Sequence, residues 1–518
     1  MSKLTDYTTF AQAHEHFSSA KLWDLFDGDR EHLNIAHECV DRHAAQGRDA
    51  LIVVHAEGQT ETITYQQLSE DTSRFAHWLD ELGVKPGDRV AIMLEPSRAY
   101  YVAMYGVIKF GAIAVPMFTL FGPDGMRLRL NDCEPVLLVT NREKEETARS
   151  VAKCDLMVLD QPALDALQKF PSTFKVNTRA DSLAVFQYTS GTTRELPEAV
   201  RHSHRALVTV MVAALYGTGV RPGDRYFCPS SPAWGHGMWH GTLAPMALGL
   251  TVGAYAGRFN PERLLQALSE HRFTNMAAAA THYRMMRNSG AASRYAYHFN
   301  KLSFTGEPMD DETSAFVRKT FGIEICSMYG TTEIGVVLVN YPGASDFPVK
   351  RGAMGKPPPG TVVEVHDASG KPCPPEQIGQ LMVMRKGQWI HTKDLARADK
   401  DGYFYHAGRA DDVIISAGWT MSAVEIENAI LKHPDVLEAA AIGVIDAVRG
   451  QVVKAFVVAR RKGDDAFATE IQNLVRSKLS AHEFPRQVAF VDELPKTPAG
   501  KVHRKVLRDR ELAAATKS

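Results

Sequence analysis

Several features that would assign a chain to a special class are missing from this sequence. Its charges nearly cancel, with 59 lysines and arginines against 60 aspartates and glutamates and a net charge of -1. No overall field therefore favours nucleic acid or an anionic membrane as a partner, although a local basic patch could still hold an anionic cofactor. We expect neither a nucleic-acid nor a membrane partner.

Cysteines are few and scattered. None lie at the short paired spacings that chelate zinc, so we expect buried or idle thiols in a reducing compartment. The six are Cys39, Cys133, Cys154, Cys228, Cys326 and Cys373. The polar N-terminus shows no signal peptide, and no apolar run reaches the length of a membrane span, which predicts a cytoplasmic location. Nothing in the sequence fixes the oligomeric state.

Short apolar runs alternate with longer amphipathic ones through most of the chain. Residues 89–94 and 112–115 have the pattern of strands, and residues 100–110 have the pattern of a helix. This alternation predicts an α/β fold with largely parallel sheets. Past residue 360 the pattern changes to β-rich segments with turn residues, at 361–366 and 379–384, which we expect to form a β-rich subdomain.

The length of 518 residues requires more than one domain. We predict a large N-terminal domain over residues 1–409, built of α/β subdomains and the β-rich subdomain. A small mobile α+β domain is expected over residues 410–518, because that stretch carries its own strand and helix signals.

A loop rich in hydroxyl groups follows the apolar segment that ends near Phe186. Glycine lets a backbone approach an anion, and hydroxyls and successive N–H groups supply donors without bulk, so the loop predicts a phosphate site. The candidate residues are Thr189, Ser190, Gly191, Thr192, Thr193 and Arg194.

Three more sequence motifs follow this loop along the chain. Residues 328–333 read Met-Tyr-Gly-Thr-Thr-Glu, residues 408–418 read Gly-Arg-Ala-Asp-Asp-Val-Ile-Ile-Ser-Ala-Gly, and residues 495–504 read Pro-Lys-Thr-Pro-Ala-Gly-Lys-Val-His-Arg. Together with the loop they resemble the adenylate-forming superfamily, and residues 303–308 resemble its acetyl- and medium-chain acyl-CoA synthetase branch. The resemblance spans nearly the whole chain.

The resemblance implies ATP, Mg²⁺ and coenzyme A as cofactors and a small carboxylic acid as substrate. The catalytic residues would be Lys501, Thr332 and Glu333: the lysine bridges carboxylate and α-phosphate, the threonine meets the α-phosphate, and the glutamate binds the metal. The residues expected to bind the nucleotide or CoA are Gly306, Glu307, Pro308, Tyr329, Gly330, Thr331, Asp394, Arg409 and Gly418.

The resemblance also implies that the small domain rotates between two half-reactions, with Asp411 as the hinge. Two departures from the family pattern stand out. Lys393 replaces the glycine that usually precedes the ribose-binding acid, which puts the loop geometry in question. In the phosphate loop Arg194 replaces a glycine and Glu198 a lysine. Either Arg194 takes over the cationic contact, or this part of the loop contributes little, or the chain binds nucleotide and catalyses poorly.

The segment at 229–240 carries no acid, which argues against an amino-acid substrate. Gly330 stands where acetate-specific relatives have tryptophan, so we expect a medium-chain, branched or aromatic acid. Trp234, His236, Trp239 and His240 are candidates for the acyl pocket, with core packing as the alternative for each. The expected activity is an AMP-forming acid:CoA ligase. The alternatives are transfer of the acyl adenylate to a carrier protein and a nucleotide-binding relative with weak catalysis.

Overall fold

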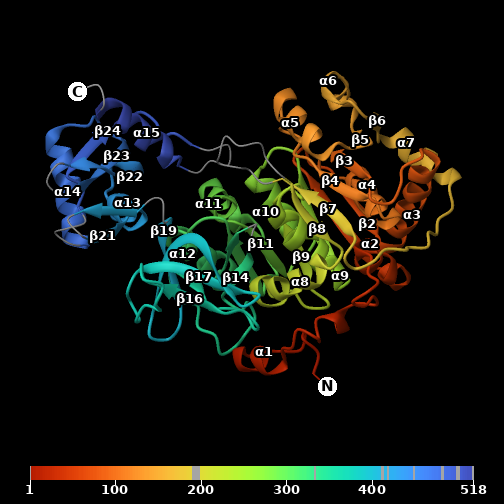
Figure 1. Cartoon of the computed structure of the whole chain (residues 1–518), viewed down its shortest axis with the longest axis horizontal. Helices are drawn as coiled ribbons and strands as arrows, with labels where there is room; N and C mark the ends of the chain where they lie inside the picture. Colours follow the sequence, from red (N-terminus) through yellow and green to blue (C-terminus); the bar gives the residue numbers. More distant parts are fainter. Residues whose placement is uncertain are drawn as a thin grey trace. The chain divides into compact units, whose positions relative to one another are not determined.

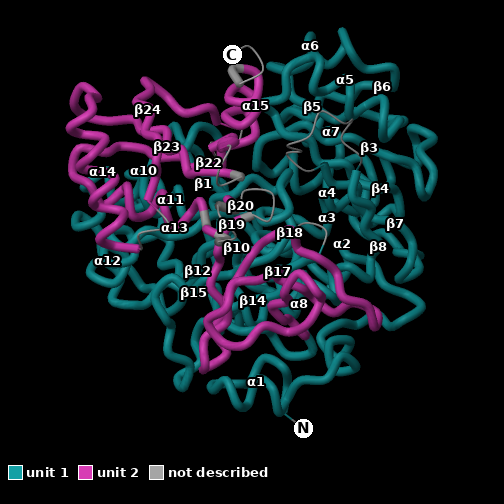
Figure 2. The backbone as a smooth tube through the Cα atoms, turned by 60° about the vertical axis from the view of Figure 1, so that its left-hand side comes forward, with its two compact units in different colours: residues 1–361 teal, residues 362–518 magenta. Residues whose placement is uncertain are grey.

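The computed structural model describes residues 2–188, 199–331, 334–409, 413–416, 419–446, 450–479, 484–496 and 502–515. The chain divides into two compact units, residues 1–361 and 362–518 (Figure 2). The predicted domain boundary at 409/410 lies inside the second unit and stays a prediction. No helix in the described ranges combines the length and apolar character needed to cross a bilayer.

The first unit contains two mostly parallel sheets (Figure 1). In the larger, the order is β14 (Gly335–Val339), β13 (Cys326–Thr331), β12 (Lys301–Thr305), β11 (Asn275–Ala279), β9 (Arg225–Cys228), β10 (Thr251–Ala256), β1 (Asp49–His55), β2 (Thr60–Thr64). In the smaller, it is β6 (Asp155–Val158), β5 (Leu137–Thr140), β3 (Arg89–Met93), β4 (Ile113–Pro116), β7 (Leu183–Gln187), β8 (Val200–Ser203). Only β14, β2 and β8 pair antiparallel among these described strands. The predicted α/β fold is confirmed.

α-Helices alternate with the strands of the first unit. They are α1 (Phe10–His16), α2 (Ile35–Cys39), α3 (Tyr65–Glu81), α4 (Arg98–Phe110), α5 (Pro123–Cys133), α6 (Glu145–Val151), α7 (Gln161–Ala166), α8 (Ala206–Ala213), α9 (Ala244–Ala247), α10 (Pro261–Glu270), α11 (Ala280–Ser289) and α12 (Asp311–Phe321). Helix α3 contacts β1 and β2, and α4 contacts β3 and β4, so this helix pair joins the two sheets. The unit also contains a short strand, β15 (Ala353–Gly355), and two π-helical segments, η5 (Ala214–Thr218) and η6 (His236–Leu243).

Local sequence explains where the helices near the larger sheet begin and end. Helix α10 starts at Pro261 after Asn260, whose side chain accepts hydrogen bonds from two backbone N–H groups of the first turn. Helix α12 is capped in the same way by Asp310 and ends at Gly322, whose φ of 75° suits glycine. Leucines of α10 and the aromatic Phe227 of β9 belong to one buried cluster, in which Phe227 and Phe273 pack edge to face at 4.9 Å. The helices are thereby fixed against the sheet.

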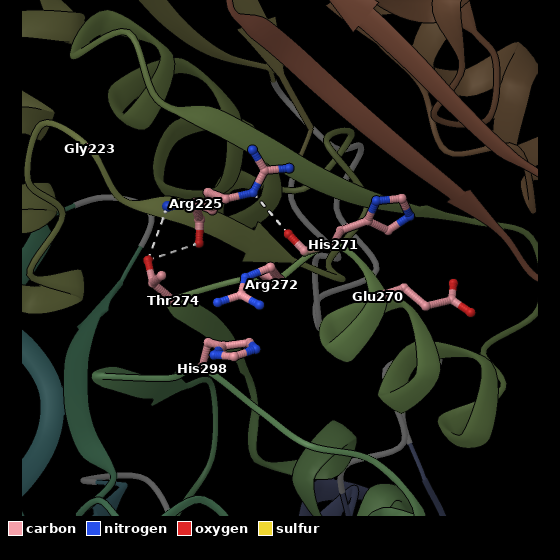
Figure 3. A pocket seen from close by; sticks show the side chains of 7 residues that line it. All are labelled: Gly223, Arg225, Glu270, His271, Arg272, Thr274 and His298. Atoms are coloured by element: carbon pink, nitrogen blue, oxygen red, sulfur yellow. Dashed lines mark hydrogen bonds between the residues drawn. The ribbon is translucent and has the colours of Figure 1, made fainter.

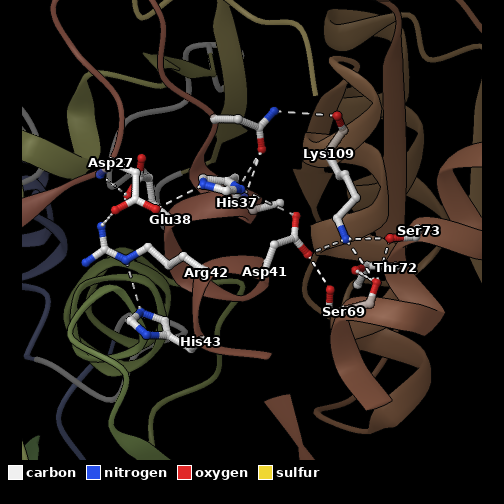
Figure 4. Close-up of polar contacts among 12 residues, drawn as sticks. Asp27, His37, Glu38, Asp41, Arg42, His43, Ser69, Thr72, Ser73 and Lys109 are labelled. Carbon is white, nitrogen blue, oxygen red and sulfur yellow. Dashed lines mark hydrogen bonds and ion pairs between the residues drawn. The ribbon is translucent and has the colours of Figure 1, made fainter. Parts of the chain in front are cut away.

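A network of charged groups is buried where α2, α3 and α4 meet (Figure 4). Lys109 has no solvent-exposed surface, and its Nζ donates to the carboxylate of Asp41 at 2.6 Å and to the hydroxyl of Ser73 at 3.0 Å. Glu38 is paired with Arg42 at 2.5 Å. Each of these buried charges has a partner of opposite sign. The attraction within the pairs offsets free energy that is lost when the charges are removed from water.

The second unit is built of antiparallel β-structure followed by a mixed α+β part. Strands β16 (Val363–His366), β17 (Gly379–Arg385), β18 (Gln388–Ala398) and β19 (Phe404–Arg409) form consecutive antiparallel pairs. The remainder contains β20 (Val413–Ser416), β21 (Trp419–Ser422), α13 (Ala423–Ile430), β22 (Val436–Asp446), β23 (Gly450–Ala459), α14 (Asp465–Lys478), β24 (Gln487–Phe490) and α15 (Arg504–Ala515). The predicted β-rich segments at 361–366 and 379–384 are confirmed as paired strands.

Candidate active site

Several predicted site residues lie at one edge of the larger sheet. Strands β9, β11, β12 and β13 are parallel, so their carboxyl ends share that edge. The segment at 229–240 follows β9, and the segment at 306–308 follows β12, while Tyr329, Gly330 and Thr331 end β13. In open α/β sheets this is the edge at which ligands bind. The fold therefore brings the expected acyl and adenine segments to a common place.

The turn after β12 is held by polar contacts from α11. Gly306 has φ of 91°, a value that suits glycine. The carboxylate of Glu307 accepts a hydrogen bond from the hydroxyl of Thr281 and pairs with Arg284 at 2.5 Å. Pro308 is exposed. The start of α11 thus fixes the Gly306–Pro308 segment.

Gly330 lies at an irregularity in the β13–β14 pair. A Cβ at this position would collide with the backbone of β14, at the carbonyl oxygen of Gly335. Glycine is therefore required by the close approach of the two strands, whatever the size of the acyl group. Its contribution to a larger acyl pocket stays a prediction.

The segment expected to bind the acyl group is tied to the strands on either side of the predicted phosphate loop. The indole N–H of Trp239 donates to Oε1 of Gln187, the last residue of β7, at 3.0 Å. The same indole packs on His202 of β8, with ring centroids 4.8 Å apart. Trp239 is buried, whereas Trp234 is half-buried and packs on Phe118 at 5.4 Å. Trp239 therefore connects η6 to β7 and β8, the two strands on either side of the predicted phosphate loop.

His236 and His240 belong to η6. The Nδ1 of His236 lies 3.0 Å from the hydroxyl of Ser230. Burial, with smaller contributions from the nearby rings of His240 and His282, lowers the pKa of His236 to about 3. Burial also lowers the pKa of His240 to about 4. Both rings are consequently neutral at pH 7.

The two flanks of the phosphate loop meet at Asp132 of α5. Its Oδ2 accepts hydrogen bonds from the hydroxyl of Tyr188 at 2.7 Å and from the backbone N–H of Ala199 at 3.3 Å. One carboxylate oxygen thus clamps the chain just before and just after the loop. Sequence reasoning missed Asp132, as it missed Gln187, Thr281 and His282, because no local motif marks contacts between distant segments.

In the second unit, Asp394 of β18 lies opposite Arg409 of β19 in the strand register. The two residues predicted near the ribose are therefore neighbours. The carboxylate of Asp394 is buried and lies 3.6 Å from Nε2 of His406. Lys393, which stands in place of glycine, has φ of 66° and an exposed side chain. The backbone here adopts the left-handed conformation for which glycine is best suited.

The remaining predicted residues lie outside the described ones. They are Thr189, Ser190, Gly191, Thr192, Thr193, Arg194, Thr332, Glu333, Asp411, Gly418 and Lys501. Their roles stay predictions. Among the described residues, no group of three or more histidines, cysteines, aspartates or glutamates is arranged to hold a metal ion. All six cysteines are described, and each is a free thiol.

A surface hollow of about 550 Å³ lies elsewhere (Figure 3). It is lined by Gly223, Arg225, Glu270, His271, Arg272, Thr274 and His298. Because Arg225 begins β9 and Thr274 directly precedes β11, this hollow is at the amino ends of the strands. It is therefore distinct from the edge that carries the predicted site residues.

Two family matches cover most of the chain. Residues 40–389 match the family described as "AMP-binding enzyme", and residues 425–501 match "AMP-binding enzyme C-terminal domain". The chain belongs to the AMP-binding enzymes, the adenylate-forming family of acyl-CoA synthetases.

Individual relatives agree with this assignment. The chain is 30% identical to the uncharacterized acyl-CoA ligase YtcI of Bacillus subtilis, over 92% of this chain and 96% of that one. It is also 30% identical to the acetyl-coenzyme A synthetase of Bacillus subtilis, over 93% and 91%. The crystal structure of an acyl-CoA synthetase from Brucella canis matches with a TM-score of 0.76 and 29% identity, over 98% of this chain and all of that chain. The chain is accordingly an AMP-forming acid-thiol ligase, and this family uses ATP and CoA.

Proposed function

We propose that this ligase activates a medium-chain, branched or aromatic carboxylic acid in two half-reactions. In the first, a carboxylate oxygen attacks the α-phosphorus of ATP and pyrophosphate leaves. In the second, the sulfur of CoA attacks the carbonyl carbon of the acyl adenylate, a thioester bond forms, and AMP leaves. The absence of an acidic residue from the segment at 229–240 supports an acid without an ammonium group.

One observation carries the proposal most directly. The segments after β9, β11 and β12 and the end of β13 converge on a single sheet edge. Adenylation needs an acid and a nucleotide held side by side, so that the carboxylate meets phosphorus in line. Trp239 of the expected acyl segment donates a hydrogen bond to Gln187 of β7, shortly before the phosphate loop. An acid would have to lie beside that loop to meet the α-phosphorus.

The catalytic roles rest on the family resemblance. Lys501 would offset negative charge between carboxylate and α-phosphate, and Thr332 would donate to the α-phosphate. Glu333 would hold Mg²⁺, which neutralises charge on the phosphates of ATP. Asp394 and Arg409 would hold the ribose, and Thr189 to Arg194 would hold the departing pyrophosphate.

Domain alternation is the second part of the proposal. A rotation at Asp411 would withdraw Lys501 after adenylation and bring Gly418 to the acyl adenylate, along the path of the CoA thiol. A hinge of this kind confines a large change in φ and ψ to a few residues. One nucleotide site would thereby serve both half-reactions, each with its own set of catalytic groups.

A panel of acids tests the substrate class. Pyrophosphate release would be measured with acetate, hexanoate, octanoate, isovalerate and benzoate, and AMP release would be measured with and without CoA. We expect faster turnover with the larger acids than with acetate and AMP release only with CoA. A preference for acetate would refute the substrate class, and AMP release without CoA would refute the acceptor.

Replacing Lys501 separates the two half-reactions. We predict that Lys501→Ala loses pyrophosphate release by at least about 100-fold, since one preorganised charge contributes on the order of 3 kcal/mol to a transition state. It should still form thioester from a supplied acyl adenylate. Lys505→Ala, which removes an exposed lysine four residues further on, is the matched control. Equal loss of both half-reactions in the Lys501 variant would contradict domain alternation.

A further inference from the structure

Three histidine rings lie at the ligand-binding edge with ring nitrogens that have no hydrogen-bond partner. His236 and His240 come from η6, which follows β9, and His282 comes from the first turn of α11, which follows β11. Within the described part of the chain, Nε2 of His236 and Nδ1 of His240 are buried and unpartnered. Nδ1 of His282 is also buried and makes no hydrogen bond of normal geometry, although the backbone of Ala279 lies close to this ring. Buried polar atoms are nearly always paired in folded proteins, so three such atoms at one edge need an explanation.

The rings of His236 and His240 are direct neighbours, and His282 lies in their vicinity. The ring centroids of His236 and His240 are 6.1 Å apart. His282 is close enough to His236 for a charge on it to affect the pKa of that ring. The ring of His282 is held edge-on against Phe259, with centroids 4.6 Å apart. The three rings therefore act on one small region, which we call the histidine cluster: His236, His240 and His282.

The orientation of His236 is fixed from its other nitrogen. Its Nδ1 lies 3.0 Å from the hydroxyl of Ser230 and 3.7 Å from the thiol of Cys228. Both partners belong to β9 or the turn that follows it. Because this side of the ring is occupied, the unpartnered Nε2 lies on the opposite side, away from Ser230.

The chemistry of the cluster favours an uncharged partner. Burial lowers the pKa of His236 to about 3, and those of His240 and His282 to about 4. All three rings are neutral at pH 7, and a neutral imidazole offers one N–H donor and one acceptor nitrogen. A carboxylate would need a cation, and the nearby Arg284 is already paired with Glu307. A hydroxyl group both donates and accepts, and so complements neutral imidazoles.

Two contacts place the cluster beside the expected substrate positions. Within η6, Trp239 is bonded to Gln187, directly before the phosphate loop. At the start of α11, Thr281 donates to Glu307 of the segment expected along adenine. His236 and His240 belong to the same segment as Trp239, and His282 follows Thr281, so all three rings come from the two segments expected to line the substrate.

We propose that His236, His240 and His282 hold an uncharged hydroxyl group on the acid substrate, remote from its carboxylate, so that the enzyme selects hydroxy acids over unsubstituted acids of the same size. This selection rests on the proposed function, because it assigns the substrate class of that same site. A buried polar site of this kind discriminates strongly, since an acid without the hydroxyl leaves the ring nitrogens unpaired.

Matched pairs of acids provide the test. Pyrophosphate release would be measured with hexanoate against 6-hydroxyhexanoate, benzoate against 3-hydroxybenzoate, and 6-hydroxyhexanoate against adipate. We expect kcat/KM to be at least about tenfold higher for the better hydroxy acid than for its unsubstituted partner, and higher for 6-hydroxyhexanoate than for adipate. Tenfold corresponds to about 1.4 kcal/mol. Equal or lower kcat/KM for both hydroxy acids, or a preference for adipate, would overturn the proposal.

Variants tie the preference to the cluster. His236→Leu and His282→Leu should bring the ratio between hydroxy acid and unsubstituted acid close to one by slowing the hydroxy acid alone, and His236→Gln should restore part of it. His298→Leu, at an exposed histidine of the other hollow, is the control and should keep the wild-type ratio. An unchanged ratio in both leucine variants would overturn the proposal. Should a leucine variant fail to fold, the wild-type ratios still decide.

The histidine cluster and the proposed function would be refuted by different results. Release of pyrophosphate with unsubstituted acids, at a rate equal to or above that with their hydroxy partners, would refute the histidine cluster and leave the proposed function intact. No release with any acid of either panel would refute the proposed function and the cluster with it.

Discussion

His204 is a buried histidine whose neutral form the fold requires. Its side chain has no exposed surface, and the backbone N–H of Ile35 donates to its Nδ1 at 3.1 Å. Since Nδ1 accepts this hydrogen bond, it must be free of a proton. Burial lowers the pKa of His204 from 6.5 to about 4. A proton added to the ring would both charge a buried group and break the contact with Ile35.

The size of the effect follows from linkage between proton binding and folding. Because the folded pKa is below the unfolded one, the unfolded chain takes up the proton first as the pH falls. The stabilisation is complete above pH 6.5 and is lost between pH 6.5 and about 4. One pKa unit corresponds to about 1.4 kcal/mol, so the loss is about 3 kcal/mol in full and about 2 kcal/mol by pH 5.

The substitution His204→Gln removes the titrating group and keeps an acceptor for the N–H of Ile35. The free energy of unfolding would be measured by urea denaturation at pH 7.5 and pH 5.0. We expect the wild-type chain to lose about 2 kcal/mol more than the variant over this interval. His298→Gln, an exposed position in the same unit, should follow the wild type.

Other buried histidines also destabilise the fold in acid, but they contribute equally to both proteins and cancel in the difference. Their pKa values are lowered by burial to about 4 or about 3, and they are His43, His202, His236, His240 and His282. The same pH dependence in the wild type and in His204→Gln would refute the reasoning.

Three further predictions concern stability. Lys109→Met should lower the free energy of unfolding in urea by about 3 kcal/mol, because it leaves the carboxylate of Asp41 without its ammonium partner (Figure 4); adding Asp41→Asn should recover part of the loss, and no recovery would contradict this cause. Lys393→Gly should raise the free energy of unfolding by about 1 kcal/mol by relieving a left-handed φ, and a loss of stability would argue against strain there. Gly330→Ala should lower the thermal midpoint, with a loss of about 1–3 kcal/mol in the free energy of unfolding, because β14 must move to make room for the Cβ. An unchanged midpoint would show that the methyl group fits without a movement of β14.

Local elements could be predicted because short-range patterns decide them. The apolar run at 89–94 became β3 (Arg89–Met93), and the amphipathic run at 100–110 became α4 (Arg98–Phe110). Helix α10 begins at Pro261, because Asn260 and Pro261 form a favourable start. Periodicity and capping act within a few residues, so a single sequence contains them.

Other features depend on contacts that no short pattern records. Asp132 clamps Tyr188 and Ala199 across more than fifty residues. The glycine-rich segment at 235–241 forms part of a π-helix, a rare conformation, and a Cβ at Gly237 would collide with the backbone carbonyls of Ser230 and Ser231. The Asp132 contacts arise only when distant parts of the chain meet, and the contact at Gly237 arises only once the turn after β9 and η6 have folded back on each other.

Two positions near the site, Gly330 and Lys393, show why a motif glycine can be replaced in one place and not in another. At Gly330 the backbone of β14 leaves no room for a Cβ, so any side chain must displace a strand. At Lys393 only the conformation favours glycine, since φ is 66° while the side chain is exposed. A left-handed residue costs about 1–2 kcal/mol, which a folded domain tolerates, whereas a displaced strand would shift Tyr329 and Thr331 as well. A missing motif glycine therefore argues against function only where the space for a side chain is absent, and by this criterion Lys393 is compatible with the role proposed for Asp394.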